Sequence, residues 1–142
     1  MIPVVTAAER MPSKYAELYT SRVQNAHAPI LPVKTMEGFE AHYKADHSST
    51  LYDTFNHPDG HAGLPPVYFV IAELDPLRDD AVVYEKVLRE EYGIPTRYKM
   101  YEGLPHGFWG FLPQLGVSQR LVGETVEGVK WLLTKPKESW KD

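Results

Sequence analysis

Residues 67–73, VYFVIAE, form a run whose centre is apolar without alternation between polar and apolar side chains. A strand with one face in water alternates, whereas a central strand of a parallel sheet is covered on both faces and stays apolar throughout. The run therefore predicts a buried parallel strand. Parallel strands need long crossover connections, usually helices, so this stretch restricts the chain to an α/β architecture.

The sequence after this run has the required alternation. Residues 79–92, DDAVVYEKVLREEY, predict a helix that ends at Gly93, and residues 96–101, TRYKMY, alternate as a half-exposed strand does. Residues 117–134 predict a second amphipathic helix. Its apolar positions, at helical spacing, are Leu121, Val122, Val126, Val129 and Leu133.

The sequence before the central run is less regular. IPVVT, residues 2–6, predicts a third strand, so we expect a sheet of about three parallel strands at 2–6, 67–73 and 96–101 with flanking helices. We divide this single domain, residues 1–142, into an inserted helical and loop segment, 7–62, and a βαβα core, 63–134. Within the insert, short helices are expected at 13–19 and around Met36, Phe39 and Tyr43.

Composition excludes several classes of function. The chain has 142 residues, a net charge of −4 and no basic run, which argues against nucleic acid or an anionic membrane as a partner. It has no cysteine, hence no thiolate nucleophile and no disulfide, and we expect a reducing, cytoplasmic location. No apolar run approaches the roughly 20 residues that span a bilayer.

Two turns that follow the predicted strands carry reactive side chains. Asp75 follows the strand at 67–73, and His106 follows the strand at 96–101. Functional groups in open parallel sheets gather beyond the carboxyl ends of the strands, so we expect the two side chains to meet there. A carboxylate beside an imidazole fixes its tautomer and supports the imidazolium formed during proton transfer. The alternative for Asp75 is an Asx turn or a helix cap, and for His106 a turn residue without chemistry.

Aromatic residues around His106 suggest a binding site for a small apolar molecule. Phe108, Trp109 and Phe111 are the predicted substrate-binding residues, with ordinary core packing as the alternative. In the insert, Tyr15, Tyr19, Met36 and Phe39 are expected in the core, with a pocket lining as the alternative. Four histidines, His42, His47, His57 and His61, match no zinc spacing. We therefore predict no metal and no cofactor.

Two motifs give the sequence a family resemblance. LPPVYFVIAELDPLRDD and YEGLPHGFW resemble the acid loop and the histidine loop of the α/β-hydrolase fold-3, or hormone-sensitive-lipase-like, esterases, with fungal secondary-metabolism members the most similar. The resemblance covers nearly the whole chain. It implies that Asp75 and His106 are the acid and the histidine of a Ser…Asp…His triad.

The resemblance is to the C-terminal part of that fold. The Gly-x-Ser-x-Gly nucleophile elbow and the HGGG oxyanion loop of the family do not occur in these 142 residues. The nearest string, GVSQR at 116–120, lacks the second glycine and opens the last predicted helix. We therefore expect a truncated α/β-hydrolase fold with two triad members and no serine nucleophile.

Three functional hypotheses follow. In the first, His106 and Asp75 perform acid–base catalysis (cyclisation, isomerisation or elimination) on a small apolar metabolite. In the second, the chain is an ester hydrolase fragment that needs a serine from another chain or from upstream sequence. In the third, it is a non-catalytic binding protein. An uncovered parallel edge favours strand addition, so we also predict a homodimer, joined edge to edge near residues 2–6 or through the surfaces that the missing part of the fold would cover.

Overall fold

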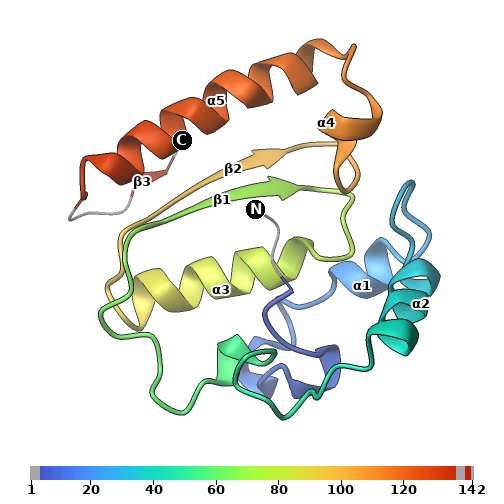
Figure 1. Cartoon of the computed structure of the whole chain (residues 1–142), viewed down its shortest axis with the longest axis vertical. Helices are drawn as coiled ribbons and strands as arrows, with labels where there is room; N and C mark the ends of the chain where they lie inside the picture. The colour runs from blue at the N-terminus through green and yellow to red at the C-terminus, as the bar shows by residue number, and fades with distance from the viewer. Residues whose placement is uncertain (1–3, 137–139, 142) are drawn as a thin grey trace.

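The computed structural model describes residues 4–136 and 140–141. Its layers follow one another as in Figure 1: helix α5 (Gly116–Leu133), the strands, helix α3 (Arg78–Glu90), and then the irregular N-terminal segment. The α/β class predicted from the sequence is confirmed. The arrangement places the carboxyl ends of the strands next to the N-terminal segment, and this is where the candidate site lies.

The sheet is built on two parallel strands. Strand β1 (Val67–Ala72) pairs with β2 (Thr96–Tyr101) over six residues, from Val67 opposite Thr96 to Ala72 opposite Tyr101. Both strands were predicted within one residue of these bounds. Helix α3 connects them, and Gly93 follows this helix with a left-handed φ of 63° that favours glycine.

Apolar side chains cover both faces of β1. Phe69 and Ile71 pack with Ala81, Leu88 and Ile94 beneath the sheet, where α3 lies. The alternate residues of the strand point the other way. Val70 and Ala72 pack with Tyr101, Phe108 and Leu121 on the side of α5. This two-sided burial explains why the run at 67–72 is apolar without alternation.

Helix α3 is buried on two sides. Its second face, Val83 and Val87, packs against Val5, Tyr15 and Phe55 from the N-terminal segment. That segment contains short 3-10 helices (Ala8–Arg10, Ser13–Tyr15 and Thr54–Asn56) and the helices α1 (Ser21–Gln24) and α2 (Val33–Tyr43). The helix predicted at 13–19 is therefore only one 3-10 turn, whereas the helix around Met36 and Phe39 is confirmed as α2.

The strand predicted at 2–6 is wrong for its described part. Residues 4–6 form no strand, and residues 2–3 lie outside the described residues. The backbone of Val5 is hydrogen-bonded elsewhere: its N–H donates to Asp80 Oδ1 at 3.4 Å, and its carbonyl accepts from the N–H of Phe55 at 3.0 Å. Val5 is buried and packs against Val83 and Val87 of α3, whereas Val4 is 44% exposed. A short apolar run does not by itself specify strand pairing.

The third strand lies at the other end of the chain. Strand β3 (Trp140–Lys141) pairs in parallel with β2, from Arg97 opposite Trp140, so the sheet order is β1-β2-β3. The backbone of these two residues continues the sheet beyond β2. Among the described residues, β1 has a strand neighbour on one side only.

Helix α5 confirms the helix predicted at 117–134 within one residue at each end, and a short helix α4 (Phe108–Phe111) precedes it. Leu121 is buried, but Val122, Val126, Val129 and Leu133 are 47% to 77% exposed. These four residues, here called the α5 stripe, share one face of the helix at spacings of four, three and four residues. In the part of the chain that the structure describes, no helix is both long and apolar enough to cross a bilayer.

Candidate acid–base site

The turns after β1 and β2 lie side by side. Both strands end at the same level, with Ala72 opposite Tyr101. Two hydrogen bonds then join the turns: the N–H of Leu74 donates to the carbonyl of Leu104 at 3.0 Å, and the N–H of Gly103 donates to Glu73 Oε2 at 2.7 Å. These contacts bring together the acid and the histidine, which are 31 residues apart in the sequence.

Asp75 is completely buried and held in place by the chain around it. Its Oδ1 accepts a hydrogen bond from the N–H of Leu77 at 2.8 Å, which closes an Asx turn just before α3. Its backbone carbonyl accepts a hydrogen bond from Nδ2 of Asn25 at 3.1 Å. The turn role that was the alternative for Asp75 is therefore present, and Oδ2 remains available to another partner.

That partner is His106. Its Nδ1 lies 2.6 Å from Asp75 Oδ2, and its side chain is 32% exposed. An ionised carboxylate only accepts hydrogen bonds, so Nδ1 carries the proton and Nε2 presents its lone pair. The two side chains are thus arranged as a base and the carboxylate that orients it. The contact predicted from the two motifs is present, while a catalytic role stays a prediction.

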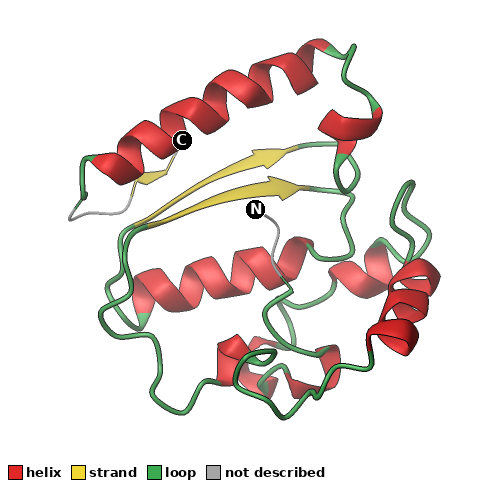
Figure 2. Cartoon of the chain, in the orientation of Figure 1, coloured by secondary structure: helices red, strands yellow, loops and turns green. Residues whose placement is uncertain are grey.

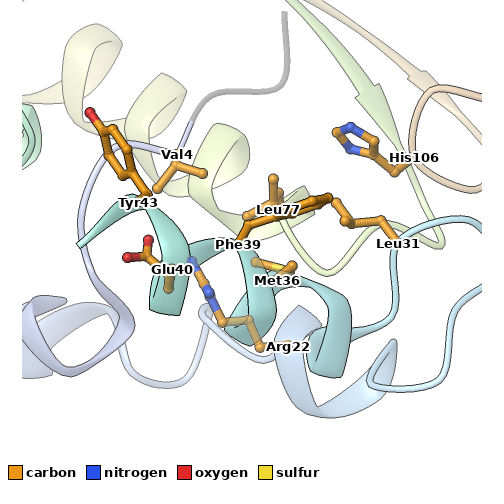
Figure 3. A pocket seen from close by; sticks show the side chains of 9 residues that line it. All are labelled: Val4, Arg22, Leu31, Met36, Phe39, Glu40, Tyr43, Leu77 and His106. Carbon is orange, nitrogen blue, oxygen red and sulfur yellow. The ribbon is translucent and has the colours of Figure 1, made fainter. Parts of the chain in front are cut away.

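An apolar cavity of about 300 Å³ lies beside the imidazole. Figure 3 shows its lining, with His106 at one end and Glu40 and Tyr43 at the other. Between them the wall is apolar. The lining consists of Val4, Leu31, Met36, Phe39, Leu77, Arg22, Glu40, Tyr43 and His106. Helix α2 contributes four of these residues, at positions 36, 39, 40 and 43, because one helical face repeats at three and four residues.

The predicted substrate-binding aromatics do not line this cavity. Phe108 is completely buried and packs against Tyr101 and Trp109, and Phe111 is 66% exposed. Trp109 is partly buried in the same cluster on the α5 side of the sheet. The substrate-binding role of all three stays a prediction, and the positions of Phe108 and Phe111 do not favour it.

The N-terminal segment contributes instead. Met36 and Phe39, expected in the core, line the cavity, whereas Tyr15 does pack in the core, edge-on to Phe55. For Met36 and Phe39, a position in a cavity wall was only the alternative to the predicted core position. It did not single out Arg22 or Glu40, since neither belongs to a motif and both depend on contacts with distant residues.

Two aspartates at the start of α3 hold this segment against the helix. Asp79 Oδ2 accepts hydrogen bonds from the N–H groups of Thr20 and Ser21, at 2.7 and 2.6 Å. Asp80 accepts hydrogen bonds from the Tyr19 hydroxyl at 2.9 Å and from Arg22 Nη2 at 3.4 Å. Both carboxylates thus bind the segment that carries the cavity wall.

Burial perturbs the acid–base properties of this anchor. Loss of hydration raises the pKa of Asp80 to about 6, despite the opposing effect of the Arg22 charge. Burial and the neighbouring Asp80 carboxylate also raise the pKa of the Tyr19 hydroxyl well above its usual value. The anchor is therefore a hydrogen-bonded polar cluster in which the Asp80 carboxyl takes up a proton as pH falls through about 6.

None of the described serines lies among the residues that line the cavity with His106. Ser118, in the string closest to a nucleophile elbow, is buried and donates a hydrogen bond from its hydroxyl to the carbonyl of Leu112 at 2.8 Å. Ser21 Oγ donates to the carbonyl of Pro76 at 2.7 Å. Within residues 4–136 and 140–141, no group of three or more His, Asp or Glu side chains is placed to hold a metal ion.

Comparisons with known proteins agree with this geometry. A family model described as alpha/beta hydrolase fold matches residues 2–110. Versiconal hemiacetal acetate esterase of Dothistroma septosporum is 37% identical over 138 residues, which are 96% of this chain and 42% of that protein. An AB hydrolase superfamily protein of Schizosaccharomyces pombe is 33% identical over 138 residues, covering 97% of this chain and 40% of the relative.

Among solved structures, the crystal structure of vibralactone cyclase superimposes with a TM-score of 0.88 at 32% identity. The match covers 94% of this chain and 39% of the cyclase. The chain thus spans about two fifths of the length of these three relatives.

Proposed function

The chain belongs to the α/β-hydrolase fold family, and from that premise we propose that His106, oriented by Asp75, acts as an acid–base catalyst on a small apolar molecule bound in the adjacent cavity. The observation that carries the proposal is the 2.6 Å contact between His106 Nδ1 and the buried Asp75 carboxylate beside that cavity. The reaction is a proton transfer that promotes cyclisation, isomerisation or elimination.

The chemistry needs only a base whose proton acceptor faces the substrate. Nε2 takes a proton from the bound molecule, and the Asp75 carboxylate stabilises the imidazolium that results. The imidazolium then returns the proton to another atom of the product. General acid–base catalysis of this kind contributes about 10²–10⁴-fold, sufficient for a reaction that is already favourable.

The cavity supports an apolar substrate. Leu31, Met36, Phe39 and Leu77 contribute apolar side chains to its wall, so the transfer of a hydrocarbon body from water into the cavity is favourable. One solved relative is named a cyclase and one curated relative an acetate esterase. Both names are compatible with an apolar molecule that carries a carbonyl group near the imidazole.

Ester hydrolysis is the second candidate. The relative with 37% identity is named an esterase, and a base oriented by a carboxylate is what an attacking serine hydroxyl requires. In this version the serine comes from another chain or from sequence beyond these 142 residues. The two candidates share the dyad and the cavity, and they differ in whether a serine takes part.

A probe reaction without a nucleophile tests the first candidate. In the Kemp elimination of 5-nitrobenzisoxazole, a base takes the C3 proton, the N–O bond breaks and a coloured cyanophenolate forms. We expect the purified chain to accelerate this reaction, and His106→Ala to abolish the acceleration. His57→Ala is the matched control, because the side chain of His57 is 36% exposed, close to the value for His106, and lies outside the cavity.

The second assay uses p-nitrophenyl esters with and without a serine-directed phosphonate. Ester turnover that the phosphonate abolishes would replace the first candidate by the second. Absence of both activities in a folded protein that still binds apolar ligands would leave a non-catalytic binding protein and overturn both.

A further inference from the structure

The cavity has a polar end, and we propose that this end, formed by Arg22 and Glu40, binds a hydroxyl group of the ligand. This proposal rests on the proposed function in one respect: the other end of the ligand is taken to lie at His106. It narrows the substrate class to an uncharged, elongated molecule with a carbonyl group at His106, an apolar body, and an alcohol or phenol at the Arg22–Glu40 end.

The guanidinium of Arg22 is held in place by two hydrogen bonds and still has an unused N–H donor. Its Nε donates to the Tyr19 hydroxyl at 3.0 Å, and its Nη2 donates to Asp80 at 3.4 Å. Among the described residues, Nη1 of Arg22 has no hydrogen-bond partner. It is therefore available to donate to a ligand. The side chain is 22% exposed and lines the cavity. In Figure 3 the guanidinium points toward Glu40.

Glu40 is the corresponding acceptor. Tyr52 donates its hydroxyl to Oε1 at 2.5 Å, and His47 Nε2 lies 3.2 Å from Oε2. The hydrogen bond from Tyr52 is the main cause that lowers the pKa of the carboxyl, so it is ionised at neutral pH. A carboxylate has about four acceptor positions, and the two protein contacts leave room for a third donor. Glu40 therefore accepts a hydrogen bond from a ligand group that also accepts one from Arg22.

The charges select the ligand group. The Arg22 guanidinium already faces Asp80 across 3.4 Å, and Glu40 adds a negative charge at the same end of the cavity. An anionic group would meet the Glu40 carboxylate, and a cationic group would meet the guanidinium. A hydroxyl group is neutral and is both donor and acceptor, so it satisfies both side chains without adding a charge.

The apolar middle of the cavity sets the orientation. Leu77, Phe39 and Leu31 separate His106 from the polar end in Figure 3. A ligand hydroxyl in that middle region would lose its hydrogen bonds to water without replacement, which weakens binding. The hydroxyl is therefore directed to Arg22 and Glu40, and the rest of the molecule extends toward the imidazole.

The test compares three ketones of equal length, which cannot be hydrolysed: octan-2-one, its ω-hydroxy derivative and the corresponding ω-carboxylate. Dissociation constants are measured by ligand-observed NMR titration. We expect the wild-type chain to bind the hydroxy ketone about tenfold more tightly than octan-2-one, and the carboxylate more weakly than both. Glu40→Gln should reduce the hydroxyl preference to less than threefold, whereas Glu37→Gln, an exposed position on the same helix, should leave it unchanged.

Each result decides the question. Equal binding of the hydroxy ketone and octan-2-one, or a preference that survives Glu40→Gln, overturns the inference. The readout involves no turnover, so its failure is distinct from that of the proposed function. A preserved preference without Kemp activity overturns only the catalytic proposal. Kemp activity that depends on His106, without a hydroxyl preference, overturns only the ligand assignment.

Discussion

Nδ1 of His106 lies 2.6 Å from Oδ2 of Asp75, and the second oxygen of that carboxylate is occupied by the N–H of Leu77. The backbone contact fixes the rotation of the carboxyl group, and the carboxyl group in turn fixes the imidazole. This arrangement leaves Nε2 as the acceptor of the ring, beside a cavity whose wall is largely apolar.

The first prediction concerns Asp75→Asn. The N–H of Leu77 will hold the amide oxygen, so the amide NH₂ will face His106 Nδ1 and the ring will shift its proton to Nε2. We expect the His106-dependent Kemp rate to fall by about 10²-fold or more, because the acceptor is then turned away from the cavity. Nitrogen NMR shifts of the imidazole report the tautomer directly.

Asp53→Asn is the control for that variant. Asp53 is also buried and paired, with Arg10 Nε at 2.6 Å, but lies outside the cavity. It should lower stability while leaving the Kemp rate of the folded protein unchanged. An unaltered tautomer in Asp75→Asn would contradict the positioning role of Asp75.

The second prediction concerns acid. The pKa of Asp80 is raised by burial from 3.8 to about 6, so between these values the folded chain binds a proton that the unfolded chain does not. This group therefore contributes stability that is fully present below pH 3.8 and is lost as pH rises through 6. The contribution is on the order of 3 kcal/mol.

Asp80→Asn removes this titration. The free energy of unfolding of the wild type minus that of Asp80→Asn should increase as pH falls from 7 to 4, measured by urea unfolding at several pH values. Taking this difference removes the contribution that all other titratable groups, present in both proteins, make to the pH dependence of stability. A difference that is flat with pH, or that decreases on acidification, would show that Asp80 has no raised pKa.

The third prediction uses two glycines of α5. A Cβ added to Gly128 would lie inside van der Waals distance of the Tyr68 ring, whereas one added to Gly123 would have no heavy atom within 4 Å. We expect Gly128→Ala to destabilise the fold by about 1–3 kcal/mol through overpacking. Gly123→Ala should stabilise it by up to about 1 kcal/mol, because alanine is the better helix former. Thermal unfolding of both variants checks this, and equal effects would contradict the close approach of α5 to β1.

The fourth prediction concerns self-association. The homodimer expected from the sequence stays a prediction, but its expected location changes, since residues 4–6 form no strand edge. The α5 stripe is the better candidate, because contiguous exposed apolar side chains favour association. Light scattering at micromolar concentration should report a dimer that dissociates in Val122→Lys/Val129→Lys.

Leu51→Lys provides the matched control, because Leu51 is an exposed apolar residue in a loop far from α5 in the sequence. It should leave the dimer intact. A wild-type chain that is monomeric at these concentrations would exclude the dimer altogether.

The cytoplasmic location expected from the absence of cysteine also stays a prediction.

The sequence by itself determined the central elements and the dyad. The continuous apolar run at 67–72 needs two covered faces, and the alternation at 96–101 needs one, so periodicity alone identified β1 and β2. Parallel strands end at the same edge, so the residues after them had to be neighbours. For this reason Asp75 and His106 could be paired across 31 residues, and the family assignment from the two motifs around them is confirmed.

Only the tertiary structure decided what surrounds the dyad. The run at 2–6 has the pattern of a strand, but the N–H of Val5 donates to Asp80 and its carbonyl accepts from the N–H of Phe55, about 75 and 50 residues away in the sequence. The spacing of the apolar residues in α5 predicts one face of an amphipathic helix. The four residues of the α5 stripe are nevertheless exposed in the structure. The cavity wall comes from α2 and Arg22, whose positions depend on the buried aspartates at the start of α3. Such contacts join residues far apart in the chain, and no local pattern encodes which of the possible partners will meet.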